Sequence, residues 1–257
     1  MLTSDTSRGS VVPAEKDSGK SFSQLREEFT RFVMGYKFGI DEIMTKINIL
    51  REEFNHVHEY NPIEYVGSRL KSPESILAKA LRKGCPITMD DIRDQILDIA
   101  GIRVTCSFLS DTYKIRDMIA AQHDITVLLE RDYIANPKPN GYKSLHLIVS
   151  VPVYMSDRVV QVTVEIQIRT IAMDFWASLE HKIFYKYRGS VPAAMVEELA
   201  QAAAAANALD KQMEKLHVGI TQIKRAGAPE QRALPAGDLS QLVIPQALLD
   251  ALQSYRR

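Results

Sequence analysis

The sequence predicts an α+β domain in which a β-sheet of four or five strands is flanked by helices, the longest of them at the two ends. Two observations lead to this fold class. Near both ends, apolar residues recur at spacings of three and four, which is the period of an amphipathic helix. Between those regions, several segments alternate apolar and polar residues, which is the period of a half-buried strand.

The helices are expected to differ greatly in length. A long helical pattern begins at Phe22 and includes Phe54, and Asn61-Pro62 breaks it. A shorter helix over residues 72–83 is closed by Gly84. Further helices are expected over residues 111–121, 171–187 and 193–226. The last helix has coiled-coil-like spacing of its apolar residues, which are Leu209, Met213, Leu216, Ile220 and Ile223.

Strands are expected over residues 102–108, 125–134, 145–153 and 159–168, and residues 136–141 form a loop because they combine two prolines with Asn-Gly. The most regular alternation covers residues 160–169. Its polar face carries Gln161, Thr163, Glu165, Gln167 and Arg169. A solvated strand face would explain this pattern, but a carboxylate beside an amide and a guanidinium is unusual there.

Composition excludes several classes of protein. The chain has 257 residues, of which 46% are hydrophobic, so one sizeable domain with a real core is expected. Lys plus Arg and Asp plus Glu number 32 each, so no overall field attracts nucleic acid or anionic membrane. Cys85 and Cys106 form neither a disulfide framework nor a zinc motif. With no membrane-length apolar run and no signal peptide, a soluble cytoplasmic protein is expected.

Three regions are expected along the chain. Residues 1–20 have a polar composition that is typical of disorder. Residues 21–226 form the folded domain with its long terminal helices. Residues 227–257 form a variable tail, which is rich in Gly, Pro and Ala and ends in a weak amphipathic segment.

The first polar cluster is cationic and surrounds the start of the helix at residues 72–83. Arg69 and Lys71 precede this helix, and Ser75, Lys79 and Arg82 share one of its faces. Cations near a helix N-terminus suit a polyphosphate. A solvated basic face would explain the same pattern.

The second cluster is the run from Asp98 to Arg103. Simple alternation places Asp98 on the face opposite to Arg103, unless Gly101 hosts a bulge or Asp98 lies before the strand proper. An Asp at the mouth of a strand is a common metal ligand, and equally a common turn or helix-capping residue.

The third cluster is a loop built for binding, although a polar loop with a structural Tyr is the alternative. It comprises Arg131, Lys138, Asn140, Tyr142, Lys143 and His146. Tyr142 is expected to be free to stack on a base. Two carboxylates, Asp98 and Glu165, with many cations indicate a Mg²⁺-dependent phosphoryl or nucleotidyl transfer site. The sequence has neither a Walker loop nor a kinase glycine-rich loop.

Six ordered motifs resemble the synthetase domain of the RelA/SpoT family, from about residue 22 to residue 225, and most resemble its stand-alone small alarmone synthetases. The motifs are Arg69-Leu70-Lys71-Ser72, Asp98-Ile99-Ala100-Gly101-Ile102-Arg103, Asp132-Tyr133-Ile134, Asn140-Gly141-Tyr142-Lys143-Ser144-Leu145-His146, Glu165-Ile166-Gln167-Ile168-Arg169-Thr170 and Trp176-Ala177-Ser178-Leu179-Glu180-His181.

This resemblance implies a nucleotidyltransferase-like mixed sheet and a GTP diphosphokinase activity. Such an enzyme transfers the β,γ-pyrophosphate of ATP to the ribose 3′-hydroxyl of GTP or GDP, giving pppGpp or ppGpp and AMP. By motif, Asp98 and Glu165 would bind Mg²⁺, and Glu165 would also take the proton of the 3′-hydroxyl. The resemblance assigns ATP binding to Arg69, Lys71, Ser75, Lys79, Arg82 and Arg103. It assigns guanosine-nucleotide binding to Tyr142, which would stack on guanine, and to Arg131, Lys138, Asn140, Lys143, His146 and Gln167. Arg131 stands where the family commonly has a lysine.

The resemblance also bears on assembly and regulation. Some small synthetases are tetramers that their product activates, and they would have Lys, Thr and Asn where this chain has Asn48, Gly67 and Asp174. We therefore expect a homotetramer, formed through the terminal helices, without strong product activation.

Hydrolase activity is not expected, because only a helical arm precedes the synthetase motifs and His123-Asp124 is the one His-Asp pair. Two alternatives to the enzyme remain. A degenerate paralogue could bind RNA, although the neutral net charge gives no support, and a coiled-coil scaffold would leave the polar strand face unexplained.

Overall fold

The computed structural model describes residues 21–186 and 192–227. The expectations for residues 1–20 and for the tail beyond residue 227 lie outside this part of the chain. In chain order the elements are α1 (Phe22–Val57), β1 (Ile63–Leu70), α2 (Pro73–Lys83), α3 (Met89–Gln95), β2 (Ala100–Cys106), α4 (Leu109–Ala120), β3 (Thr126–Asp132), β4 (Leu145–Tyr154), β5 (Val159–Thr170), α5 (Ile171–Lys186) and α6 (Ala193–Gly227).

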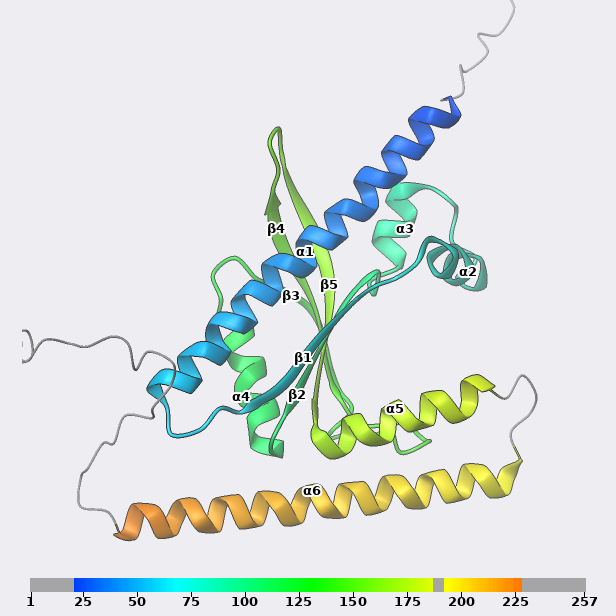
Figure 1. The fold of residues 1–257 in the computed structure, drawn as a ribbon. Helices are drawn as coiled ribbons and strands as arrows, with labels where there is room; N and C mark the ends of the chain where they lie inside the picture. Colours follow the sequence, from blue (N-terminus) through cyan, green and yellow to red (C-terminus); the bar gives the residue numbers. More distant parts are fainter. Residues whose placement is uncertain (1–20, 187–191, 228–257) are drawn as a thin grey trace, which may run out of the picture.

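The five strands form one mixed sheet in the order β1-β2-β5-β4-β3 (Figure 1). Strands β2 and β5 are parallel, whereas the other three neighbouring pairs are antiparallel. The expected α+β class and the expected strand number are therefore confirmed. Strand β1, at the edge of the sheet, was not predicted.

One face of the sheet is covered by α1 and α4, and this interface forms the core. Three apolar side chains of α1, Ile40, Ile43 and Ile47, are at most 4% exposed, and they belong to one buried cluster with Val164 and Ile166 of β5. Burying each such side chain contributes about 2 kcal/mol, so this face holds α1 along much of its length. The long first helix is confirmed (Figure 1).

The connection from β1 to β2 carries two short helices. Ser72 caps α2 by accepting from the Ser75 N–H, and Gly84 ends it in the left-handed conformation with φ +66°. Helix α3, which was not predicted, begins after Thr88 and ends at Gln95. The chain then turns through Asp98 and enters β2.

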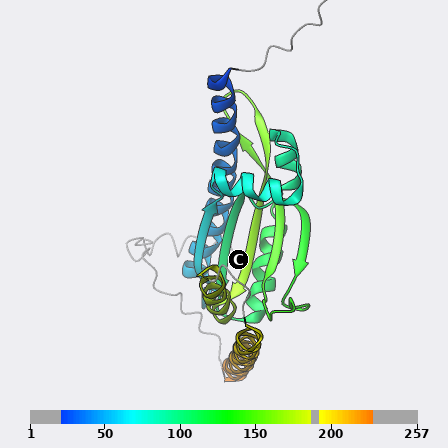
Figure 2. The same cartoon turned by 90° about the vertical axis from the view of Figure 1, so that its right-hand side faces the viewer.

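Helices α5 and α6 lie together at the end of the sheet where β2 and β5 finish (Figures 1 and 2). Trp176 of α5 is buried against Ala203 of α6, and its indole N–H donates to the Leu199 carbonyl. Within the described residues, no helix is both long enough and apolar enough to cross a membrane.

Candidate functional site

A row of polar side chains crosses the sheet on the face opposite to the α1 core. The register pairs Gly67 of β1 with Arg103 of β2, Arg103 with Gln167 of β5, Gln167 with His146 of β4, and His146 with Arg131 of β3. Paired residues in neighbouring strands share a face. Residues far apart in the sequence, such as Arg103 and Gln167, therefore lie side by side, and the polar face of the central strand β5 forms the middle of this row.

The neighbouring row places Glu165 in the same site. Glu165 is the register partner of Gly101, which in turn pairs with Arg69 of β1. Since Gly101 has no side chain, the space between Arg69 and Glu165 stays open on this face. Glu165 therefore lies between Arg69, which is predicted to bind ATP, and the residues Gln167 and His146, which are predicted to bind the guanosine nucleotide.

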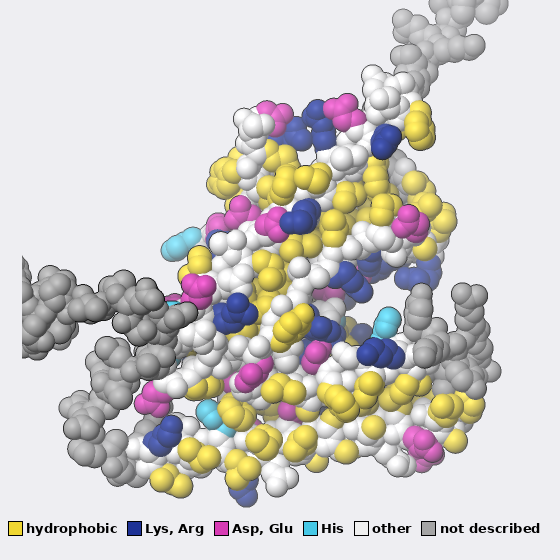
Figure 3. Space-filling view, viewed as in Figure 1, with side chains coloured by type: hydrophobic (Ala, Val, Ile, Leu, Met, Phe, Trp, Pro, Cys, Tyr) yellow, Lys and Arg dark blue, Asp and Glu magenta, His cyan; other side chains and the backbone are white. Residues whose placement is uncertain are grey.

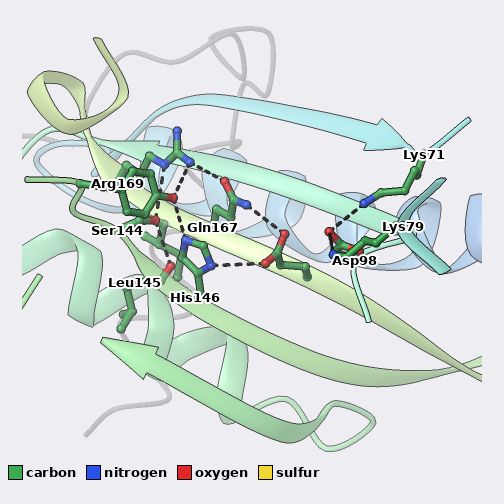
Figure 4. A network of polar contacts seen from close by, with 11 residues as sticks. Lys71, Lys79, Asp98, Ser144, Leu145, His146, Gln167 and Arg169 are labelled. Carbon is green, nitrogen blue, oxygen red and sulfur yellow. Dashed lines mark hydrogen bonds and ion pairs between the residues drawn. The ribbon is translucent and has the colours of Figure 1, made fainter. Parts of the chain in front are cut away.

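Asp98 reaches this face because it lies in the turn before β2, not within the strand. The phase conflict with Arg103 therefore disappears, and no bulge at Gly101 is needed. Lys71 and Lys79 donate to Asp98 Oδ2 over 2.8 and 2.6 Å, from the end of β1 and from α2 (Figure 4). The Lys71 backbone N–H also donates to the Ile99 carbonyl, which fixes β1 against this turn.

The electrostatics of Asp98 favour its ionised form. The side chain is 19% exposed. Burial alone would raise the pKa of Asp98, but the hydrogen bonds from Lys71 and Lys79 outweigh burial and hold the pKa below its usual range. Burial lowers the pKa of Lys71 in spite of its contact with Asp98. This corner of the site therefore holds a carboxylate with two close ammonium groups.

Glu165 is oriented by two donors. Gln167 Nε2 donates to Glu165 Oε2 over 2.9 Å, and His146 Nδ1 lies 3.3 Å from Glu165 Oε1. Burial raises the pKa of Glu165, but the contacts with His146 and Gln167 outweigh burial, so its pKa lies below the usual value. Asp98 acts in the opposite direction through its charge, as expected for two carboxylates that face one space.

Arg169 is a central residue of the candidate site, although the sequence alone assigns no role to it. Its guanidinium donates to Gln167 Oε1 over 2.5 Å and to the Tyr142 hydroxyl over 2.8 Å (Figure 4). It also pairs with Asp174 of α5 at 3.2 Å. The alternation placed Arg169 on the polar face. Its partners in the loop before β4 and on α5 follow only from the tertiary structure.

Tyr142 is held in place by several contacts, and its stacking on a base stays a prediction. Its hydroxyl contacts Arg169 and His146 Nε2, the latter at 2.8 Å, and its ring meets Trp176 at 6.5 Å between centroids. Lys138 Nζ lies 4.7 Å from the ring centroid. Burial raises the pKa of Tyr142. A base that stacked here would meet an ordered ring.

The rest of the binding loop is tied to the C-terminal helices. Lys143 donates to Asn207 of α6, and Asn140 donates to Glu180 of α5 over 3.3 Å. Burial, with the nearby Lys211, lowers the pKa of Lys143. Helices α5 and α6 therefore shape the loop that the sequence predicts to bind a guanosine nucleotide.

Several other predicted site residues are exposed. Arg69, Ser75 and Arg82 are exposed on β1 and α2, and Arg131 is exposed on the edge strand β3. Arg103 is intermediate in its solvent exposure. It pairs with Asp174 at 3.3 Å and lies 5.7 Å from the centre of the Tyr65 ring.

Comparisons with known proteins show which family this chain resembles. Residues 68–190 match the model of the region found in RelA and SpoT proteins. The chain is 49% identical over 189 residues to the GTP pyrophosphokinase YwaC of Bacillus subtilis, covering 74% of this chain and 90% of YwaC. The crystal structure of small alarmone synthetase 2 from Bacillus subtilis superposes with a TM-score of 0.68 at 46% identity, covering 76% of this chain and 98% of that chain. Small alarmone synthetase 1 from Bacillus subtilis, in a crystal structure bound to its product pppGpp, gives a TM-score of 0.70 at 38% identity with the same coverage.

Proposed function

Because the chain belongs to the RelA/SpoT family, among its small alarmone synthetases, we propose that it is a GTP pyrophosphokinase. It transfers the β,γ-pyrophosphate of ATP to the ribose 3′-hydroxyl of GTP or GDP and releases AMP. The observation that carries this proposal is the shared face of Asp98 and Glu165, with cations beside Asp98 and hydrogen-bond donors beside Glu165.

The two carboxylates fit a Mg²⁺ ion. Asp98 Oδ1 is buried and has no hydrogen-bond partner among the described residues, so this oxygen is available as a ligand. Magnesium in nucleotide enzymes commonly uses one or two carboxylates together with phosphate oxygens and waters. We propose that Asp98 and Glu165 hold it. When bound, the ion would offset the charge of the transferred phosphates.

The protein side chains have separate roles in the proposed reaction. Lys71 and Lys79, with Arg82 and Ser75 on the same helix, bind the ATP phosphates, while Arg69 and Arg103 hold adenine from two neighbouring strands. Cationic groups at the transferred pyrophosphate stabilise the charge that develops in the transition state.

Glu165 is the general base. Its lowered pKa keeps it ionised at neutral pH, so it can accept the proton of the 3′-hydroxyl. Tyr142 stacks on guanine, and Lys138, Asn140, Lys143, His146, Gln167 and Arg131 surround the guanosine nucleotide. The hydroxyl oxygen then attacks the β-phosphorus of ATP, and AMP leaves with the bridging oxygen.

Self-association is the second part of the proposal. Apolar side chains on one helix are left exposed, and Figure 3 shows hydrophobic side chains along the length of α6. The exposed residues of α6 include Leu209, Met213, Leu216, Ile220 and Ile223. An exposed apolar stripe of this length is typical of an interface. We propose that it joins copies of the chain in a homotetramer that is not strongly activated by pppGpp.

We also propose that the chain lacks hydrolase activity. Asp124 of the His123-Asp124 pair forms an ion pair with Lys46 at 2.7 Å. Among the residues that the structure describes, no three His, Cys, Asp or Glu side chains form a cluster suited to a metal ion.

A labelling experiment tests the proposed reaction. The purified protein is incubated with Mg²⁺, GDP or GTP, and ATP labelled at either the γ- or the α-phosphate. With the γ-label, radioactivity should appear in the guanosine product, whereas the α-label should appear only in AMP. Absence of product with both acceptors would contradict the proposal and favour a degenerate, RNA-binding paralogue.

A further inference from the structure

We propose that Arg169, anchored by Asp174, is a positioning residue that directs a hydrogen-bond donor onto each oxygen of Glu165. The inference deepens the proposed function, since it concerns the orientation of the proposed general base. Arg169 does not itself contact Glu165 in the network of Figure 4. It acts through two separate hydrogen-bond paths, each of which links successive side chains.

The first hydrogen-bond path passes through Gln167. An arginine side chain can only donate, so the Gln167 atom that faces Arg169 NH2 must be the amide oxygen. The amide nitrogen of Gln167 is then turned toward Glu165 Oε2, to which it donates over 2.9 Å. Glu165 Oε2 can only accept and favours the same orientation, so Arg169 holds the oxygen end of the amide while Glu165 receives its nitrogen end.

The second hydrogen-bond path passes through Tyr142 and His146. Arg169 NH2 also donates to the Tyr142 oxygen, so the Tyr142 hydroxyl directs its own proton to His146 Nε2. His146 Nε2 is therefore the acceptor, and the ring proton of neutral His146 is on Nδ1. His146 Nδ1 faces Glu165 Oε1 at 3.3 Å. Both hydrogen-bond paths thus begin at Arg169 NH2 and end on the Glu165 carboxylate.

Asp174 keeps the guanidinium in position. It pairs with Arg169 NH1 at 3.2 Å, and Arg169 Nε lies 3.4 Å from the Ser144 hydroxyl. The Arg169 side chain is only 9% exposed, so water cannot easily replace these partners. A lysine could keep the charge but not the planar set of donors that serves Gln167, Tyr142 and Asp174 together.

The test compares wild type with Arg169→Lys, and with Asp174→Asn as a second variant in case Arg169→Lys does not fold. Arg158→Lys is the matched control, because Arg158 pairs with the exposed Asp157 in the β4–β5 hairpin. Two readouts are taken from each protein. One is kcat with KM for ATP, and the other is the His146 tautomer, read from ¹⁵N chemical shifts of histidine-labelled protein.

Arg169→Lys is expected to lower kcat about tenfold or more, since small errors of orientation have large kinetic effects, while KM for ATP stays within about twofold. His146 should be protonated on Nδ1 in wild type and lose this preference in the variant. Arg158→Lys should match wild type in both readouts. An unchanged tautomer in Arg169→Lys and Asp174→Asn would overturn the inference, as would an unchanged kcat. The His146 tautomer can be measured without turnover. An inactive wild-type protein would therefore refute the proposed function, and the tautomer would still decide whether Arg169 positions the two donors.

Discussion

Lys79 of α2 donates to Asp98 over 2.6 Å, and this contact joins the proposed phosphate-binding helix to the proposed Mg²⁺ ligand. The two residues are 19 positions apart and come from different polar clusters of the sequence. The ammonium groups of Lys79 and Lys71 partly offset the charge of Asp98. Phosphate oxygens would offer the same ammonium groups an alternative partner.

Replacing Lys79 should therefore weaken ATP binding selectively. A charge-assisted hydrogen bond contributes about 1.5–3 kcal/mol, so Lys79→Gln should raise KM for ATP about tenfold or more and leave KM for GDP nearly unchanged. Steady-state kinetics with each substrate varied in turn measure this. Lys37→Gln, in an exposed pair with Asp41, is the control and should have wild-type constants. An equal rise of both KM values would contradict separate nucleotide sites.

Glu165→Gln should nearly abolish synthesis but preserve ATP binding. Loss of a general base typically lowers the rate by about 10²–10⁴-fold, whereas the ATP-binding cations are left intact. Product formation and calorimetric binding of a non-hydrolysable ATP analogue should be measured on the same preparation. Glu130→Gln on β3 serves as the control, because Glu130 forms an ion pair with Arg116 of α4. Retained turnover would remove Glu165 as the base.

Gly141 is expected to be essential to the guanosine side of the site. It has φ +86°, and an added Cβ would collide with the Cβ of Ala203 on α6. Gly141→Ala should therefore displace the loop from α6 and raise KM for GDP severalfold. Gly84→Ala is a matched control, since Gly84 has φ +66° but open space around it. That variant should lose about 1 kcal/mol of stability and keep its KM values.

The ionised Glu165 should make stability depend on pH. Its pKa is lower in the folded protein than in the unfolded chain, so its contribution is present above the unfolded value and lost as the pH falls through the folded value. Between about pH 5 and pH 3, the free energy of unfolding should fall more steeply for wild type than for Glu165→Gln. Denaturant titrations at several pH values measure both slopes. Equal slopes would show that Glu165 has the same pKa in both states.

The sequence was sufficient for the elements with strong periodic patterns. Ile43 and Ile47 are buried at helical spacing, and Val164 and Ile166 at strand spacing, as the hydrophobic patterns predicted. Strand β1 was missed because Gly67 and Ser68 interrupt its alternation, and edge strands need less burial. Helix α3 was missed because its seven residues are too few to show a helical period.

The sequence motifs name the residues of the candidate site, but not their arrangement. The motifs identified Asp98 and Glu165, yet alternation alone placed Asp98 on the wrong face because the turn before β2 is not visible in the pattern. The role of Arg169 depends on Tyr142, which lies in the loop before β4, and on Asp174, which lies on α5. Their convergence follows from strand pairing and helix docking, for which a single sequence has no local signal.

The central claim is that the pyrophosphate is transferred at the face shared by Asp98 and Glu165. A crystal structure of the protein with Mn²⁺, a non-hydrolysable ATP analogue and GDP tests it most directly. We expect anomalous scattering from Mn²⁺ at Asp98 and Glu165, with the GDP 3′-hydroxyl within hydrogen-bond distance of Glu165. Metal and nucleotides bound away from this face, with no 3′-hydroxyl near Glu165, would contradict it.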